Sequence, residues 1–193
     1  MNWNGEVKME LKLDGCMLRS WEKADAVPLQ KHANNRKIWS NLRDVFPHPY
    51  TLEDARWWIS QTRTVSPESS FAIATEKEII GGIGLIFLED VHRFSAELGY
   101  WLAEPYWGQG FMTIAVKSMT EFSFNQYPLM RIFACPFSHN IASQRVLEKA
   151  GYQLEGIMRK HVIKDGRILD QMLYAITDLR FHDHLPEVLG FAG

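Results

Sequence analysis

The sequence predicts an α/β fold in one domain, and three observations support that prediction. Its 193 residues suit a single domain with a sizeable core. Apolar residues make up 46% and charged residues 23%, as in an ordinary globular protein rather than a disordered or fibrous one. Residues 95–135 have the pattern of strand, glycine turn, helix and strand, a βαβ crossover between near-parallel strands. Without repeats or low-complexity linkers, residues 1–193 are expected to form one domain.

The chain begins with short strands and a helical stretch. Residues 7–15 and 16–21 resemble two strands joined at Asp14-Gly15, a dipeptide typical of hairpin turns. Residues 23–44 are broadly helical, and the proline they contain should lie in a first turn or mark a break.

A loop and a second helix follow. Pro47 and Pro49 favour extended backbone before them. Thr51 then starts a helix, because TLED combines an N-cap residue with an acidic residue three positions later. The helix ends near SPESS, residues 66–70, after which strands dominate.

The expected central strands cover residues 71–75, 79–88 and 95–103. The second is almost continuously apolar and should be buried. The third alternates Ala96, Leu98, Tyr100 and Leu102 with Glu97, Gly99 and Trp101, which assigns these two sets to opposite faces of a sheet.

The remaining elements complete the alternation of helices and strands. They are a helix at about 110–125, a strand at 130–136, a helix at 140–151, and a hairpin of residues 151–164 and 167–177 about Asp165-Gly166. The tail from 177 is expected to add a helical turn.

Several classes of partner and compartment are disfavoured. The net charge is −2 and no long Lys/Arg run occurs, so we expect no nucleic-acid partner. Cys16 and Cys135 have neither CxxC spacing nor a disulfide framework, which indicates reduced thiols. The N-terminus lacks a signal-peptide pattern, and no apolar run reaches 18 residues. We therefore expect a cytoplasmic protein without a membrane partner.

The segment PYWGQGFMTIAV, residues 105–116, has two interpretations. Its glycines can simply permit a turn with positive φ. Alternatively, backbone N–H groups at the start of the following helix form a phosphate cradle. A P-loop is excluded because no lysine and hydroxyl follow the glycine. A dinucleotide fingerprint at Gly82 and Gly84 fails because Phe87 takes the place of its third glycine.

A second motif, NIASQRVLEKAGY at 140–152, follows the next strand. Together with AELGYWLAEPYWGQGFMTIAV it resembles the GCN5-related N-acetyltransferase (GNAT) superfamily, over residues 7–176. FPHPYTLEDARWWI, EGIMRK and DGRILDQMLYAI resemble its RimJ/RimL-like branch, which modifies ribosomal-protein N-termini. The resemblance implies a mixed central sheet of about six to seven strands flanked by helices, splayed around a βαβ site for acetyl-CoA.

The resemblance also implies roles for particular residues. Strand backbone would hold the pantetheine arm, the glycine loop would cradle the pyrophosphate, and the second motif would contact the pantetheine end. The corresponding residues are Tyr100, Trp101 and Leu102; Gly108, Gln109, Gly110, Phe111, Met112 and Thr113; and Asn140 with Ser143. Purely structural roles remain open: core packing for Tyr100 and Leu102, helix capping for Asn140, and a solvated helix position for Ser143.

Direct attack of an amine on the thioester needs a proton acceptor and a proton donor. Glu97 is the candidate base, with an exposed strand carboxylate as the alternative. The usual donor position, a tyrosine seven residues after the asparagine, holds Leu147, so Ser143 is the candidate acid. His139 and His161 offer relays or plain polar surface. Backbone N–H groups near Trp101 and Leu102 would stabilise the oxyanion, and no residue set has metal-ligand spacing.

The sequence does not identify the acceptor of the acetyl group. A primary amine at a protein N-terminus is the leading expectation, with a small amine (polyamine, amino acid or aminoglycoside) or a non-catalytic acyl-CoA sensor as alternatives. A predominantly acidic cleft would favour polyamines. A homodimer is compatible with the resemblance.

Overall fold

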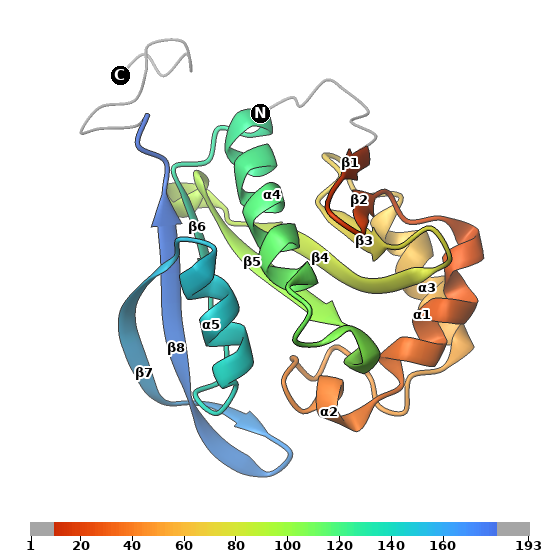
Figure 1. The fold of residues 1–193 in the computed structure, drawn as a ribbon. Coiled ribbons are helices and arrows are strands. Elements are labelled where there is room, and N and C mark those ends of the chain that lie inside the picture. The colour runs from red at the N-terminus through yellow and green to blue at the C-terminus, as the bar shows by residue number, and fades with distance from the viewer. Residues whose placement is uncertain (1–9, 181–193) are drawn as a thin grey trace.

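A computed structural model of the protein describes residues 10–180, whose strands form one sheet of eight in the order β1-β2-β3-β4-β5-β6-β8-β7 (Figure 1). The strands are β1 Glu10–Lys12, β2 Met17–Arg19, β3 Ser70–Ala74, β4 Ile79–Phe87, β5 Ser95–Leu102, β6 Arg131–Ala134, β7 Gln153–Lys164 and β8 Arg167–Thr177. The α-helices are α1 Ala26–Ala33, α2 Arg36–Trp39, α3 Leu52–Thr62, α4 Phe111–Gln126 and α5 Ile141–Lys149, and the 3-10 helices are η1 Lys23–Asp25, η2 Asp90–His92 and η3 Glu104–Tyr106.

One strand pair in this sheet is parallel, and it ends early. β5 pairs with β6 in parallel from Ser95–Arg131 to Glu97–Phe133, with α4 as the crossover between them, whereas the other neighbouring pairs are antiparallel. β5 continues to Leu102, five residues beyond this pairing. The two strands therefore form a split at their carboxyl ends, the place where ligands bind in sheets of this kind.

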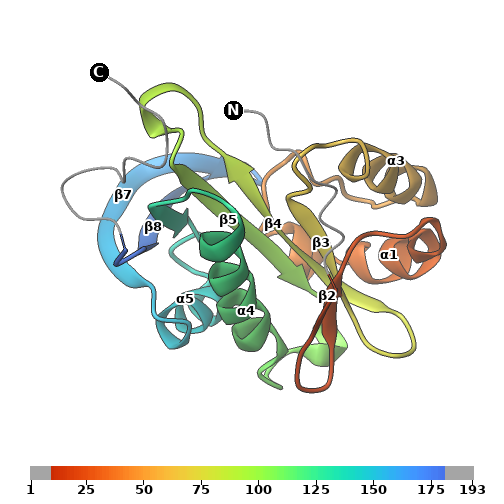
Figure 2. The same ribbon diagram turned by 90° about the horizontal axis from the view of Figure 1, so that it is seen from above.

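Two apolar cores lie on opposite faces of the sheet (Figure 2). On one face, α4 and α5 bury side chains that include Ala115, Met119 and Leu147. On the other face, α1 and α3 pack with Ala72 and Ile79. Beyond Glu97 the pairing of β5 with β6 ends, so β5 from Leu98 to Leu102 borders the split between these two cores.

Most expected elements are present, with two differences. The sheet has eight described strands instead of six to seven, since hairpins extend both of its ends. The expected single helix over 23–44 is divided into η1, α1 and α2, because Asn35 is extended (φ −136°) and its side chain accepts a hydrogen bond from Lys37 N–H as a new N-cap. The predicted capping box of Thr51 and Asp54 is confirmed.

Residues 7–9 of the first expected strand and the expected helical turn in the tail, from 181 onward, lie outside the described residues. Among residues 10–180, no helix combines the length and the apolar character that crossing a membrane requires.

Candidate active site at the split between two strands

The glycine loop leads from β5 into α4. Gly108 and Gly110 have φ values of +75° and +89°, so the turn does require residues that tolerate the left-handed region. A Cβ atom built on either glycine would meet no protein atom within 4 Å. Gly110 is the N-cap of α4, and the first helical N–H groups, from Phe111 to Thr113, have no partner within the helix. The open backbone face thus fits a pyrophosphate.

Side chains fix this loop from its inner side. The Trp107 indole donates a hydrogen bond to the Leu102 carbonyl at 2.7 Å. The Gln109 amide donates to the Pro105 carbonyl at 2.8 Å, so this side chain folds back onto the segment that precedes the loop. The Met112 side chain is buried in the core, so its contribution to a ligand would come from its backbone.

The free edge of β5 exposes the backbone of alternate residues. Ala103 N–H donates to the Ile80 carbonyl at 2.7 Å, and hydrogen-bonded pairs alternate along antiparallel strands. Trp101 is therefore directed toward β4, where it pairs with Gly82, while Tyr100 and Leu102 are directed toward the split. Of the three strand residues predicted to bind pantetheine, these two have the suitable backbone orientation.

The start of α5 faces the same split. Asn140 is the N-cap of α5, and its Oδ1 accepts a hydrogen bond from Ser143 N–H at 3.1 Å. The Tyr100 hydroxyl lies 2.8 Å from Ser143 Oγ and donates more weakly to the Ser143 carbonyl at 3.3 Å. Burial raises the pKa of Tyr100 far above its usual value, so this hydroxyl stays protonated and can orient the serine. Leu147 is fully buried.

On the opposite face, a cavity of about 510 Å³ opens beside the split. Glu97 lies in it, and its carboxylate accepts a charge-assisted hydrogen bond from Arg43. Burial, and then the negative charge of Glu97, raise the pKa of the neighbouring Cys135 thiol to about 11. The lining is otherwise largely apolar and comprises Arg43, Asp44, Glu97, Phe133, Cys135, Phe137, Met158, His161, Val162, Ile163, Lys164, Gln171 and Leu173.

The mouth of this cavity is fixed by contacts between the β7–β8 hairpin and the segment around α2. The buried Lys164 ammonium donates to Asp44 at 2.7 Å and lies 3.7 Å from the centroid of the Trp39 ring. Arg36 pairs with Asp165 at 2.6 Å. Two basic and two acidic side chains line the cavity, and they form the pairs Arg43–Glu97 and Lys164–Asp44, so the cavity is not predominantly acidic.

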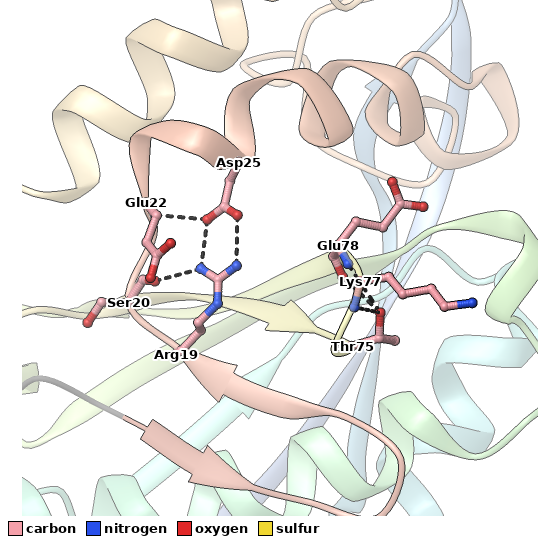
Figure 3. Close-up of polar contacts among 7 residues, drawn as sticks. All are labelled: Arg19, Ser20, Glu22, Asp25, Thr75, Lys77 and Glu78. Atoms are coloured by element: carbon pink, nitrogen blue, oxygen red, sulfur yellow. Dashed lines mark hydrogen bonds and ion pairs between the residues drawn. The ribbon is translucent and has the colours of Figure 1, made fainter.

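A second hollow of about 680 Å³ lies beside β2, α1 and the β3–β4 turn. Figure 3 shows two separate sets of polar contacts there, one around Arg19 and Asp25 and one within the turn from Thr75 to Glu78. Arg19 binds the buried Asp25 through two hydrogen bonds of 2.7 Å, and Asp25 also accepts from Glu22 N–H at 2.8 Å. Thr75 Oγ1 accepts from the backbone of the adjacent turn. We interpret these contacts as structural support for the N-terminal helices.

The predicted site residues thus fall into two groups. The glycine loop, Tyr100, Leu102, Asn140 and Ser143 border the split from the α4/α5 face, and Glu97 lies on the other face. The sequence did not single out Arg43, Asp44, Lys164 or Gln171 as site residues, and their spacing carried no signal, since Lys164 and Asp44 are 120 positions apart. In the described part of the chain, no three His, Cys, Asp or Glu side chains form a metal-binding group.

Comparisons with known proteins agree with this architecture. Residues 16–153 match the family model described as "Acetyltransferase (GNAT) domain". The probable N-acetyltransferase YjcK of Bacillus subtilis is 35% identical over 134 residues, covering 67% of this chain and 74% of YjcK. A match to the uncharacterized N-acetyltransferase YoaA of the same organism is 36% identical and spans 54% of this chain but little more than half of YoaA, 58%.

Two further proteins resemble nearly the whole chain. The ribosomal protein uS5 alanine N-acetyltransferase of Escherichia coli is 28% identical over 177 residues, 88% of this chain and 91% of that protein. The solved structure of RimL, a ribosomal L7/L12 α-N-protein acetyltransferase in complex with coenzyme A, shares the fold with a TM-score of 0.79 at 20% identity, covering 88% and 98% of the two chains. This chain belongs to the GNAT family of acetyltransferases, with RimJ/RimL-like relatives.

Proposed function

We propose that this protein transfers the acetyl group of acetyl-CoA to a primary amine, the α-amino group of a protein N-terminus. The observation that carries the proposal is the split between β5 and β6: a phosphate-compatible glycine loop and the start of α5 border it on one face, and a cavity containing Glu97 borders it on the other. A ligand held along the split would thus reach a second ligand held in the cavity.

Acetyl-CoA supplies an activated acyl thioester, and the chain supplies the binding and positioning groups. The N–H groups at Gly110 to Thr113 bind the pyrophosphate at the positive end of the α4 dipole. The backbone groups of Tyr100 and Leu102 form hydrogen bonds with the pantetheine amides at the free edge of β5, as a neighbouring strand would. Asn140, as N-cap, positions the first turn of α5 and hence Ser143.

Ser143 is the proton donor for the departing sulfur. Its hydroxyl lies 2.8 Å from that of Tyr100, which remains protonated, so Ser143 can accept from Tyr100 while donating toward the split. Leu147 has no proton to give, so the proposal assigns the donor role to the Tyr100–Ser143 pair. To Glu97, the base candidate from the sequence, we assign the attraction of the acceptor ammonium, which takes the place of its partner Arg43.

The character of the cavity favours a peptide over a polyamine. A polyamine carries several positive charges, whereas the lining holds two carboxylates, Glu97 and Asp44, balanced by Arg43 and Lys164. If one ammonium exchanges with Arg43 at Glu97, the other carboxylate still has Lys164, so a second positive charge lacks a partner. Apolar side chains such as Phe133, Met158 and Leu173 suit an uncharged side chain next to a single amine. Acetylation of ribosomal-protein N-termini by the uS5 alanine and L7/L12 relatives is consistent with this choice.

The experiment is a thiol-release assay with acetyl-CoA on a panel of N-terminal peptides, matched peptides with blocked α-amines and an internal lysine, spermidine, and free amino acids. We expect turnover with unblocked peptides and mass spectra showing one added acetyl group at the N-terminus. Turnover restricted to spermidine or free amino acids would reassign the acceptor. Absence of thiol release with every amine, despite acetyl-CoA binding, would indicate a sensor.

A further inference from the structure

We propose that His161, held in one tautomer by Gln171, is the group that removes the proton from the acceptor amine. This inference rests on the proposed function, because it assigns a role within the same cavity. His161 and Gln171 both line that cavity, His161 from β7 and Gln171 from β8.

The tautomer follows from hydrogen-bond chemistry. The Gln171 amide nitrogen, Nε2, donates to the Cys135 carbonyl at 2.8 Å, and since a carbonyl can only accept, the amide orientation is fixed. Gln171 Oε1 lies 2.7 Å from His161 Nδ1 and is an acceptor. Nδ1 must therefore carry the hydrogen, and in the neutral ring Nε2 is left with the lone pair that can take a proton.

The backbone of β7 aims this ring at the cavity. The β7–β8 register shifts between Met158 and Val162, and Lys160 adopts φ +51°, a left-handed conformation that is unusual for a residue with a side chain. Asp170 stabilises this bulge by accepting from Lys160 N–H at 2.8 Å and from Arg159 at 2.9 Å. Bulges of this kind redirect side chains beside active sites, and here His161 joins the lining directly.

Glu97 and His161 take different roles because they have different hydrogen-bond partners, Arg43 and Gln171. Glu97 already accepts a hydrogen bond from the Arg43 guanidinium, so its carboxylate is placed to hold a cationic group. His161 lines the same cavity, and its Nε2 carries the unshared electron pair. In the transfer, the ammonium loses one proton to His161 Nε2, directly or through one water. That first proton passes from His161 to solvent. The neutral amine then forms the new N–C bond as the C–S bond breaks, and the second nitrogen proton goes to His161 Nε2. Ser143 gives its proton to the departing sulfur and regains one from solvent.

The test uses two substitutions with different consequences. His161→Asn keeps a short side chain that can donate to Gln171 but has no base at the Nε2 position, and His161→Ala leaves space for added imidazole. We expect His161→Asn to lower kcat about 100-fold with an unchanged Kd for acetyl-CoA, and imidazole to restore part of the activity of His161→Ala. An equally active His161→Asn variant at every pH would overturn the inference.

Two further readouts separate this role from structural support. The rising limb of the pH–rate profile should disappear in His161→Asn while Glu97→Gln retains it; the other charged or titratable groups facing the same cavity are Arg43, Asp44, Cys135 and Lys164. Nitrogen-15 NMR of the wild-type protein gives a readout that does not depend on activity. His161 should be the Nδ1–H tautomer at high pH, and an Nε2–H tautomer would overturn the inference. An inactive wild type would contradict the proposed function instead.

Discussion

The two faces of the split between β5 and β6 are built in different ways. On the α4/α5 face, the groups that fit a cofactor are largely main chain: the loop through Gly108 and Gly110, the edge of β5, and the capped start of α5. On the opposite face, the groups that suit an acceptor are side chains, which come from the α2–α3 segment, β5, β6, β7 and β8.

The fit of a cofactor therefore depends mainly on backbone geometry, whereas the fit of an acceptor depends on which side chains line the cavity. Backbone geometry around a phosphate tolerates many side chains, which explains how Met112 can occupy the first turn of α4 with its side chain in the core. The cavity proposed for the acceptor depends on particular side-chain pairs, Arg43–Glu97 and Lys164–Asp44. Substitutions on the two faces should therefore affect different ligands.

The largest effect is expected on the cofactor face. Gly110→Asp adds a Cβ at φ +89° and, with the cofactor bound as proposed, places a carboxylate against its pyrophosphate. We expect the affinity for acetyl-CoA to fall about 1,000-fold, equivalent to about 4 kcal/mol, in calorimetric titrations. Gly166→Asp is the matched control, since that glycine also has a positive φ (+71°) and open space but lies in the β7–β8 turn. Equal loss in both variants would mean that strain, not phosphate contact, is responsible.

The Arg19–Asp25 ion pair lies away from both faces of the split, so its loss should change stability and not turnover. Asp25→Ala leaves the Arg19 guanidinium without its carboxylate, and Asp25 is only 4% exposed. Breaking such a pair should lower the free energy of unfolding by about 3 kcal/mol, measured by urea denaturation. Per folded molecule, turnover should stay close to wild type, and a large fall in kcat would assign the second hollow a direct role.

The hydroxyl pair should affect chemistry without affecting cofactor binding. We expect Ser143→Ala to lower kcat about 100-fold, and Tyr100→Phe to lower it about fivefold, because the second change removes about 1 kcal/mol of orienting hydrogen bond. Stopped-flow thiol detection gives both rates. If Ser143→Ala keeps its kcat, solvent must protonate the leaving sulfur, and the α5 face would have no chemical role.

The smallest effect probes the charges in the cavity. The pKa of Cys135 is raised to about 11, so its alkylation by iodoacetamide should be slow at pH 8 and accelerate toward pH 11. Glu97 raises this pKa and Arg43 lowers it. Glu97→Gln should therefore speed alkylation at pH 8 a few-fold and Arg43→Gln should slow it, as followed by mass spectrometry. Changes of the same sign in both variants would contradict the cavity geometry.

The same contrast explains how far the sequence could predict the molecule. Local patterns identified the crossover, the glycine turn and the Thr51 cap, because each depends on neighbouring residues. The break at Asn35 was missed, since a helical pattern on both sides concealed a second cap. The cavity could not be predicted from local patterns, because Arg43, Glu97 and His161 are brought together by the register of the strands and the bulge in β7. For His161, the sequence allowed a proton relay but favoured plain polar surface, because a lone histidine on a strand is more often just that.

The separation of the two faces can be measured directly in one comparison. Glu97→Gln should be assayed for the Kd of acetyl-CoA by calorimetry and for the KM of an unblocked N-terminal peptide by thiol release. We expect the Kd to remain within about twofold of wild type, while kcat/KM for the peptide falls about 100-fold through lost attraction of the ammonium. A Kd that weakens as much as kcat/KM falls would contradict the account, because Glu97 would then belong to the cofactor face.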